Sequence, residues 1–476
     1  MLQTYLNKTK EYILLLSAGF VVSILLLEKL WIPTAGILLL FLLLRYEKKF
    51  VIVFSFVTLV TLTSSLSSTL RLSVQVSNLL LLIYFFIKNY QFDFKSYPKI
   101  PAPVTLLLIL IFSSMLLSIV FSAHPVTGIE QLVRTCVFFL FIYFFYSLIE
   151  NEDDLRLFLV AFFVAAAVLF IVVLSLFYSA DFNILRFQQK LLFGGEQNYI
   201  HKNGIGAFFV MAISILTAIF FSKQNTKHKS KIALTIFCLL TVLMVTNSRA
   251  AIISLIVSTT FILYVFNKKA MIRLLLGLAV LSTLMFLEPI SSLMENYFRI
   301  EQVFTGRDLI VESINVVISN NFIFGTGPAA VKFELYKQMP FIIGSDEWFF
   351  LTRHIESIGF GHAHSFYLFF LSELGILGFI TSIAFPVIFL SLGYRILKNI
   401  KNTDNFLFAF VIGIEAAGIS MFFRGIFEWG GLISYGAIAS DLPFWWWFIC
   451  LIYISNKYAK SDLKLSVSSK SNYSPN

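Results

Sequence analysis

Apolar runs long enough to cross a lipid bilayer recur along almost the whole chain, and they limit the fold more than any other feature. Of the 476 residues, 58% are hydrophobic and 13% are charged, whereas an ordinary soluble domain has roughly 25% charged residues. A spanning helix needs roughly 20 apolar residues, so this supply is enough for about 14 spans. The composition argues against a soluble enzyme, a disordered chain, a disulfide scaffold or a nucleic-acid-binding protein. It predicts an all-α polytopic membrane protein.

The positions of the apolar runs predict about 12–14 transmembrane helices, with 14 as the best count. The predicted spans lie at about 11–27, 30–45, 50–66, 78–91, 103–121, 132–149, 156–178, 204–222, 231–246, 250–266, 271–288, 365–392, 405–424 and 442–456. One large loop separates the spans that end near residue 288 and begin near residue 365.

The distribution of Lys and Arg predicts the orientation of these spans. With the N-terminus inside, the inner segments hold 23 of the 36 Lys and Arg residues, the outer segments hold 12, and Arg134 lies at a span edge. Positive charges are retained on the cytoplasmic side of short loops. We therefore expect both termini to be cytoplasmic. The net charge of +10 then reflects topology and not nucleic-acid binding.

The large loop, at about 289–364, is predicted to lie outside and to contain an amphipathic helix. Thr305-Gly-Arg-Asp308 has the pattern of a helix start, and apolar residues at helical spacing follow it to about residue 320. Such a helix lies on the membrane surface or over a cavity mouth. Arg307 falls in its first turn, where free backbone N–H groups favour an anion. Pairing of Arg307 with a neighbouring acidic residue is the alternative.

Three further arginines lie at the predicted outer boundary of the bilayer, where each charge is costly. Arg134, Arg249 and Arg424 stand at the ends of predicted spans. Together with Arg307 they would form a cationic ring around a phosphate-bearing group, because the guanidinium fork matches phosphate oxygens. The alternative is that each binds lipid headgroups or pairs locally. For Arg424 this alternative is favoured, since Glu428 follows four residues later.

One of the six histidines, His364, stands directly before the predicted span at 365–392. A neutral imidazole at a membrane mouth suits general base catalysis, because its pKa lies near the working pH. From the residues alone, however, a structural histidine is the favoured interpretation. A metal site formed by His362 and His364 with Glu356 or His354 is a weaker alternative.

Some familiar chemistries have no motif in this chain. No G-x-x-x-x-G-K sequence occurs, so no nucleotide is expected to power transport. The three cysteines have no paired spacing, so no zinc site is predicted. Any chemistry should then occur on the outer face with a substrate that is already activated.

The stretch HSFYLFFLSELGILG, from His364 to Gly378, resembles a signature of the O-antigen ligase and polymerase superfamily. In that family, a His at the end of the large outer loop leads into a span that carries Glu-Leu-Gly-x-x-Gly. Three more segments occur in the family's order: His201-Lys-Asn203 resembles its Pro-Asn loop, Thr246-Asn-Ser-Arg-Ala-Ala251 its Ser-Arg-Gly-Ala, and Thr305-Gly-Arg307 with Phe324-Gly-Thr-Gly-Pro328 its Gly-Arg helix and Gly-x-Gly turn. The chain departs from the pattern at Ala250, where Gly is usual, and at Lys202, where Pro is usual.

The resemblance implies a GT-C-like, multi-pass glycosyltransferase of the bacterial cytoplasmic (inner) membrane that acts in surface polysaccharide synthesis. It implies a glycan donor on undecaprenyl diphosphate, an acceptor hydroxyl on a glycan or lipid, and inversion without a metal or cofactor. His364 would be the catalytic base, and Arg249 and Arg307 would bind the diphosphate. The secondary candidates are Arg134, Arg424, Glu373 and Asn203.

The resemblance also divides the chain. The expected parts are N-terminal spans at 1–199, a catalytic core at 200–380 that includes the outer loop, and C-terminal spans at 381–460. The Ser- and Lys-rich composition of residues 461–476 predicts a disordered cytoplasmic tail. Within the enzyme class we favour a repeat-unit polymerase over a ligase, because it requires only one kind of lipid carrier. The rival classes are a transporter, for which no paired repeats are found, and a scaffold without chemistry.

Glu373 lies nine residues after His364, which on a straight helix is roughly 13 Å further along and on the opposite side. It is therefore not expected to orient His364. We expect it to fix packing between spans, with Ser248 or Arg249 as its partner.

Overall fold

The computed structural model describes residues 48–62, 68–91, 93, 95–184, 186–187, 202–222, 229–284, 287, 307–337, 344–345, 348–349, 352, 363–400 and 405–470. Helices make up most of these residues, and no strand occurs among them. Ten of the described helices are long and apolar enough to cross a membrane. The predicted all-α polytopic class is confirmed. The spans predicted at 11–27 and 30–45 lie outside the described residues.

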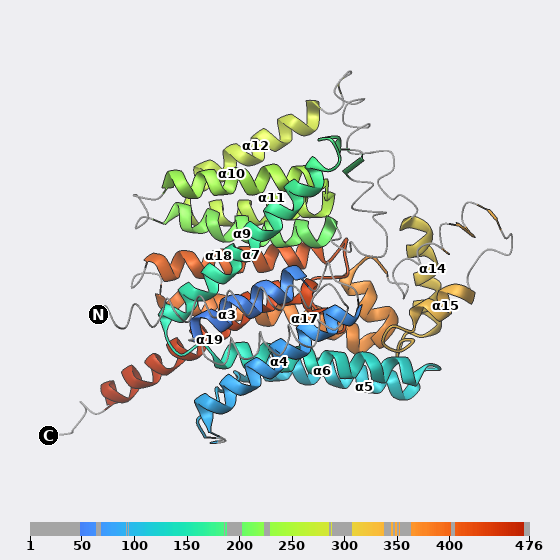
Figure 1. Ribbon diagram of the computed structural model, residues 1–476, viewed down its shortest axis with the longest axis horizontal. Coiled ribbons are helices and arrows are strands. Elements are labelled where there is room, and N and C mark those ends of the chain that lie inside the picture. The colour runs from blue at the N-terminus through green and yellow to red at the C-terminus, as the bar shows by residue number, and fades with distance from the viewer. Residues whose placement is uncertain are drawn as a thin grey trace, which may run out of the picture. The chain divides into compact units, whose positions relative to one another are not determined.

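The helices, labelled in Figure 1, follow the apolar runs of the sequence closely. Twelve of the fourteen predicted spans overlap a described helix. The elements are α3 (Lys48–Val57), the π-helical turn η2 (Thr58–Leu62), α4 (Ser68–Tyr90), α5 (Ala102–Phe121), α6 (Pro125–Ser147), α7 (Glu152–Tyr178), α9 (Lys202–Phe221), α10 (Lys229–Thr246), α11 (Arg249–Phe266), α12 (Lys268–Leu284), α14 (Arg307–Asn320), α15 (Val331–Lys337), α17 (Phe366–Ile400), α18 (Asn405–Arg424) and α19 (Ile438–Lys470).

The chain divides into two compact units, and α6 and α7 contribute residues to both. Unit 1 comprises Met1–Pro98, Tyr143–Leu169 and Phe193–Ile200, and unit 2 comprises Lys99–Ile142, Phe170–Leu192 and His201–Asn476. The division of the chain at residues 200 and 380, made from the sequence, stays a prediction.

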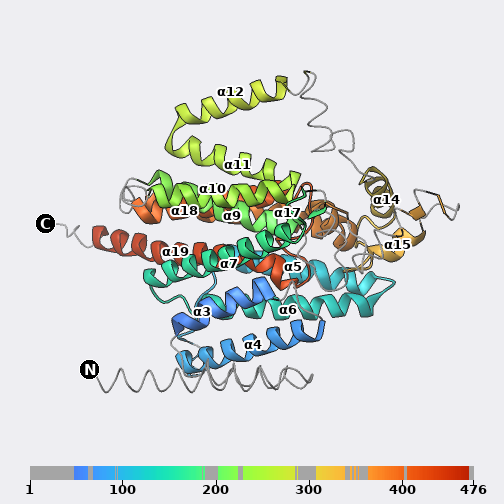
Figure 2. The same cartoon turned by 45° about the horizontal axis from the view of Figure 1, so that its top comes forward.

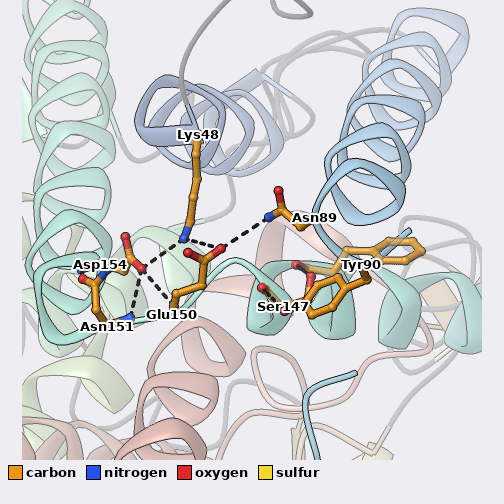
Figure 3. Close-up of polar contacts among 8 residues, drawn as sticks. Lys48, Asn89, Tyr90, Ser147, Glu150, Asn151 and Asp154 are labelled. Atoms are coloured by element: carbon orange, nitrogen blue, oxygen red, sulfur yellow. Dashed lines mark hydrogen bonds and ion pairs between the residues drawn. The ribbon is translucent and has the colours of Figure 1, made fainter. Parts of the chain in front are cut away.

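Unit 1 contains α3, η2 and α4, and a polar cluster ties the start of α3 to the segment between α6 and α7 (Figure 3). Lys48 Nζ lies 3.0 Å from Glu150 Oε1 and 3.1 Å from Asp154 Oδ2. Asp154 Oδ2 also accepts hydrogen bonds from the backbone N–H groups of Glu150 and Asn151, at 2.9 and 3.2 Å. These residues, with Asn89, are called the Lys48 cluster below.

Unit 2 is built around α9 and α18, which pack against each other and against α11. Gly413 of α18 permits the close approach, because a Cβ atom there would lie 2.9 Å from the Cα atom of Ile215 in α9. Hydrogen bonds of Asn203 with Ser248 and Arg424, and of Phe366 with Gly425, place the end of α18 beside the starts of α9, α11 and α17. Figures 1 and 2 show α14 and α15 at this same end of unit 2, with α14 crossing the direction of the long helices in Figure 1.

Helix α17 is not straight. Gly375 interrupts it with φ 67° and ψ −159°, a backbone conformation that favours glycine. The turn at residues 321–330, called the glycine turn below, packs into this kink: Ile376 N donates to Phe322 O at 3.0 Å and Gly327 N to Glu373 O at 2.9 Å. A Cβ atom at Gly325 would overlap the Glu373 carbonyl, so only glycine fits there without a shift. The straight-helix geometry assumed from the sequence was wrong, because the glycine turn satisfies the backbone groups that the kink leaves open.

Candidate functional site

His364 lies at the junction between the large loop and α17. Its φ of 51° is left-handed, a conformation in which His is enriched among non-glycine residues and which clusters at functional sites. The next two residues are anchored to the turn after α18: Phe366 N donates to Gly425 O at 2.7 Å, and Ser365 Oγ donates to the same oxygen at 3.3 Å. The end of α18 therefore fixes the backbone that carries His364.

A buried polar network joins three helices beside this anchor. Ser248 Oγ donates to Asn203 Oδ1 at 3.0 Å, and Asn203 Nδ2 donates to Glu428 Oε1 at 2.7 Å. Arg424 donates to Asn203 O at 3.1 Å and to Gly430 O at 2.7 Å. These four side chains, called the Asn203 network below, belong to residues that are only 1–8% exposed. Buried polar groups are tolerated when they are hydrogen-bonded, and these are.

The network fixes the start of α11, where the predicted diphosphate-binding residue Arg249 lies. Arg249 follows Ser248 directly, is half-buried and is the first residue of α11. Arg307 is the first residue of α14, at the same end of unit 2. Both arginines thus stand at helix N-termini, where the helix dipole and free N–H groups favour an anion.

Glu373 is fully buried and holds the glycine turn onto the bend of α17. Its Oε2 accepts a hydrogen bond from Ala329 N at 2.6 Å, and the buried Tyr435 hydroxyl is close enough to feel its charge. Burial, and next the charge of Glu373, raise the pKa of Tyr435 well above its usual value of 10. The packing role predicted for Glu373 is thus directed at the glycine turn, and not at Ser248 or Arg249.

Comparison with known protein families agrees with this geometry. Residues 234–383 match a family model described as O-antigen ligase. This segment belongs to the O-antigen ligase family. The resemblance proposed from the sequence is confirmed, and the match supports a membrane glycosyltransferase of the ligase or polymerase type in surface-glycan synthesis. A search of curated proteins found no match.

The O-antigen ligase segment contains four of the predicted site residues: His364, Arg249, Arg307 and Glu373. It does not contain all residues of the Asn203 network. Asn203 precedes it, and Arg424 and Glu428 follow it. Asn203 is the residue that contacts Ser248 and Glu428 with its side chain and Arg424 with its carbonyl oxygen. Helices on both sides of the ligase segment therefore complete its support.

Two of the predicted arginines have local partners. Arg134 Nη2 lies 2.5 Å from Glu130 Oε1, one turn away on α6, and both side chains are more than half exposed. Arg424 directs its guanidinium to backbone carbonyls of Asn203 and Gly430. For Arg134 this contact matches the alternative of local pairing. The carbonyl partners of Arg424 differ from the Glu428 pairing expected from the sequence, and the place of both arginines in a phosphate-binding ring stays a prediction.

The sequence did not single out the segment between α18 and α19, residues 425–437, called the α18–α19 turn below. It contributes Tyr435 and Glu428, and Asp441 at the start of α19 holds it by accepting from Gly431 N at 3.1 Å and Ser434 Oγ at 2.9 Å. A buried acid in the first turn of a span, after a Gly-rich stretch, was the available signal. For the alternative metal site, His354, Glu356 and His362 lie outside the described residues. Within the described part, no group of three His, Cys, Asp or Glu side chains is arranged to hold a metal ion.

Proposed function

We propose that this protein transfers a glycan from undecaprenyl diphosphate to an acceptor hydroxyl on the outer face of the bacterial cytoplasmic membrane. The observation that carries the proposal is the position of His364 within the O-antigen ligase segment. It stands in a left-handed conformation directly before α17, on a backbone anchored to Gly425. A base in this position sits on a rigid support at the end of the helices and not within the apolar interior.

The reaction we propose is a single displacement with inversion and without a metal ion. The acceptor oxygen attacks the anomeric carbon of the donor, and His364 takes the proton from that hydroxyl. The bond between the anomeric carbon and the diphosphate oxygen breaks, and the electron pair leaves with the diphosphate. A positioned general base of this kind contributes about 10²–10⁴-fold to a rate.

Arg249 and Arg307 are the residues that we assign to the diphosphate. Each begins a helix at the same end of unit 2. Their charges would bind the diphosphate and stabilise the negative charge that grows on it as it leaves. Helix α14, which buries Ile310, Ile314 and Val317 on one face, would cover the entrance for the acceptor. The Phe-rich spans would hold the polyprenyl chain.

We favour a repeat-unit polymerase, in which donor and acceptor are both lipid-linked glycans. Purified protein in liposomes would be given an undecaprenyl diphosphate glycan, and products would be sized on a gel. A ladder of increasing repeat number is expected from the wild-type protein, and His364→Ala should lose about 10²–10⁴-fold of the rate. His124→Ala is the matched control, because His124 itself precedes the ligase segment and stacks on Phe333 with ring centroids 3.9 Å apart. This variant should leave the ladder intact.

Other outcomes of the same assay would distinguish the polymerase from the ligase and from the transporter. Product that forms only after a second acceptor is added would mean a ligase. Glycan that crosses the liposome membrane without any transfer would contradict the enzyme and support the transporter. An unchanged ladder in His364→Ala would remove His364 from the mechanism.

A further inference from the structure

Three elements that carry or support the predicted catalytic residues meet at the α18–α19 turn. The start of α9 reaches it through Asn203, the start of α11 reaches Asn203 through Ser248, and the start of α17 reaches it through Gly425. All of them belong to unit 2. The turn is therefore a common attachment point for parts of the chain that lie far apart in the sequence.

The side of this attachment that leads to Arg249 consists of two side-chain hydrogen bonds. Ser248 Oγ donates to Asn203 Oδ1 at 3.0 Å, and Asn203 Nδ2 donates to Glu428 Oε1 at 2.7 Å. Asn203 uses both ends of its amide, so its orientation is fixed. A carboxylate acceptor makes the second bond a charge-assisted one, which is stronger than a bond between neutral groups.

The side that leads to His364 consists of backbone hydrogen bonds. Glu428 N donates to Arg424 O at 2.9 Å and Gly425 N donates to Met421 O at 2.9 Å, so the turn continues the end of α18 rigidly. Gly425 O then accepts from Phe366 N at 2.7 Å, two residues after His364. The Glu428 carboxylate is thus connected to the backbone at Arg249 through two hydrogen bonds. It is connected to the backbone near His364 through the turn and one hydrogen bond.

The side chains that form this link are buried, which holds Glu428 in one position. Glu428 is 6% exposed, Asn203 8% and Ser248 1%. With so little access to water, each lost hydrogen bond leaves a buried polar group unsatisfied, so alternative arrangements are costly. The same burial argues against direct contact of Glu428 with a substrate.

We propose that Glu428 is a positioning residue that sets the separation between His364 and Arg249, and hence between the base and the diphosphate. It does so by tying Asn203, and through it the start of α11, to the turn that anchors the start of α17. The inference rests on the proposed function for its catalytic meaning, but the link itself is testable without any substrate.

The kinetic test compares Glu428→Ala, Glu428→Gln and Asn203→Ala in the reconstituted transfer assay. A misplacement of about 1 Å costs up to about 10²-fold in rate, so Glu428→Ala should lower kcat at least about tenfold. The KM for the lipid-linked donor should stay within about twofold, since no donor contact is removed. Glu428→Gln keeps an acceptor oxygen for Asn203 and should recover most of kcat. The double variant Asn203→Ala/Glu428→Ala should be no slower than the slower single variant, because both act on one link.

The matched control is Asp441→Asn. Asp441 is an equally buried acid that holds the α18–α19 turn, but its partners, Gly431, Ser434 and Ser440, lie outside the link. It should lower the thermal midpoint while the folded protein keeps kcat within about twofold. An equal fall in kcat in Asp441→Asn and Glu428→Ala would overturn the proposal in favour of general loosening of the turn.

The structural test uses spin labels at Ile253 of α11 and Ile426 of the turn, which are 44% and 48% exposed. We expect Glu428→Ala to broaden or shift the distance distribution between them, and Glu428→Gln to leave it close to wild type. Unchanged distances in folded Glu428→Ala would contradict the positioning role of Glu428, whether or not transfer is detected. If the distances change in a protein that shows no glycan transfer, the structural role of Glu428 is supported and only the proposed glycosyltransferase activity is rejected.

Discussion

The Asn203 network in unit 2 and the Lys48 cluster in unit 1 join similar sets of residues in different surroundings. Each combines one basic side chain, at least one acidic side chain and an asparagine. In the Lys48 cluster, the side chains of Lys48 and Glu150 are 21% and 53% exposed, and only that of Asp154 is well covered, at 9% (Figure 3). In the Asn203 network, no residue is more than 8% exposed.

This difference in burial decides what each group of residues contributes. Exposed ion pairs are worth about 0–1 kcal/mol because water screens them. Removal of one partner from a buried charged network costs about 3–5 kcal/mol, because it leaves another charge uncompensated. Substitutions in the Lys48 cluster should therefore change the free energy of unfolding only slightly. Substitution of any residue in the Asn203 network should lower it substantially.

The largest effect is expected from Arg424→Met, which keeps the volume but removes the buried charge. The carbonyls of Asn203 and Gly430 would lose their donor, and Glu428 would stay buried in a network that no longer holds a cation. We expect a loss of about 3–5 kcal/mol of unfolding free energy, measured by denaturation in detergent micelles. A loss below about 1 kcal/mol would mean that water reaches the network and that the contrast between the units is smaller than burial indicates.

The glycine turn extends the comparison to a buried contact without charge. Gly325→Ala would bring a Cβ atom onto the Glu373 carbonyl at a φ of +73°, so we expect a loss of about 2–3 kcal/mol and reduced transfer. Gly344→Ala is the matched control, since Gly344 also has a positive φ of +90° but nothing lies within 4 Å of its Cβ position. The difference between the two variants measures the packing into the kink of α17. Equal losses would show that backbone strain alone is responsible.

The raised pKa of Tyr435, in unit 2, predicts that the folded protein loses stability at alkaline pH. Its pKa is raised in the folded protein by burial and by the charge of Glu373, so the folded state holds the proton at a pH where the unfolded state loses it. Stability from this group is complete below about pH 10 and falls as pH rises above that value. Thermal midpoints measured between pH 8 and pH 11 should fall more steeply for the wild type than for Tyr435→Phe. Parallel curves would show that Tyr435 is not buried beside Glu373.

The smallest effect is expected from Lys48→Met in unit 1. Asp154 keeps its hydrogen bonds from Glu150 N and Asn151 N, so its carboxylate stays satisfied. We expect a loss of no more than about 1 kcal/mol, which should shrink further at high salt. A loss as large as that of Arg424→Met would break the comparison between the two units.

The fold was largely predictable because the bilayer sets one dominant pattern. Spans of roughly 20 apolar residues are visible in the sequence, and the predicted spans at 103–121 and 405–424 match α5 and α18 within a residue. His364, Arg249 and Arg307 were found through local motifs, which depend on residues that are close together in the chain. The kink at Gly375 escaped prediction, because its cause lies in a turn some fifty residues earlier in the chain.

The sequence by itself determined the membrane class, the positions of most helices and the family of the segment at residues 234–383. These depend on hydropathy and short motifs, which local chemistry fixes. Only the tertiary structure decided that Glu373 holds the glycine turn, that Arg424 faces carbonyl groups and that Glu428 binds Asn203. The physical reason is that hydropathy places a helix in the bilayer but does not choose its neighbours. Those neighbours are chosen by close packing at glycines and by the need to pair each buried polar group.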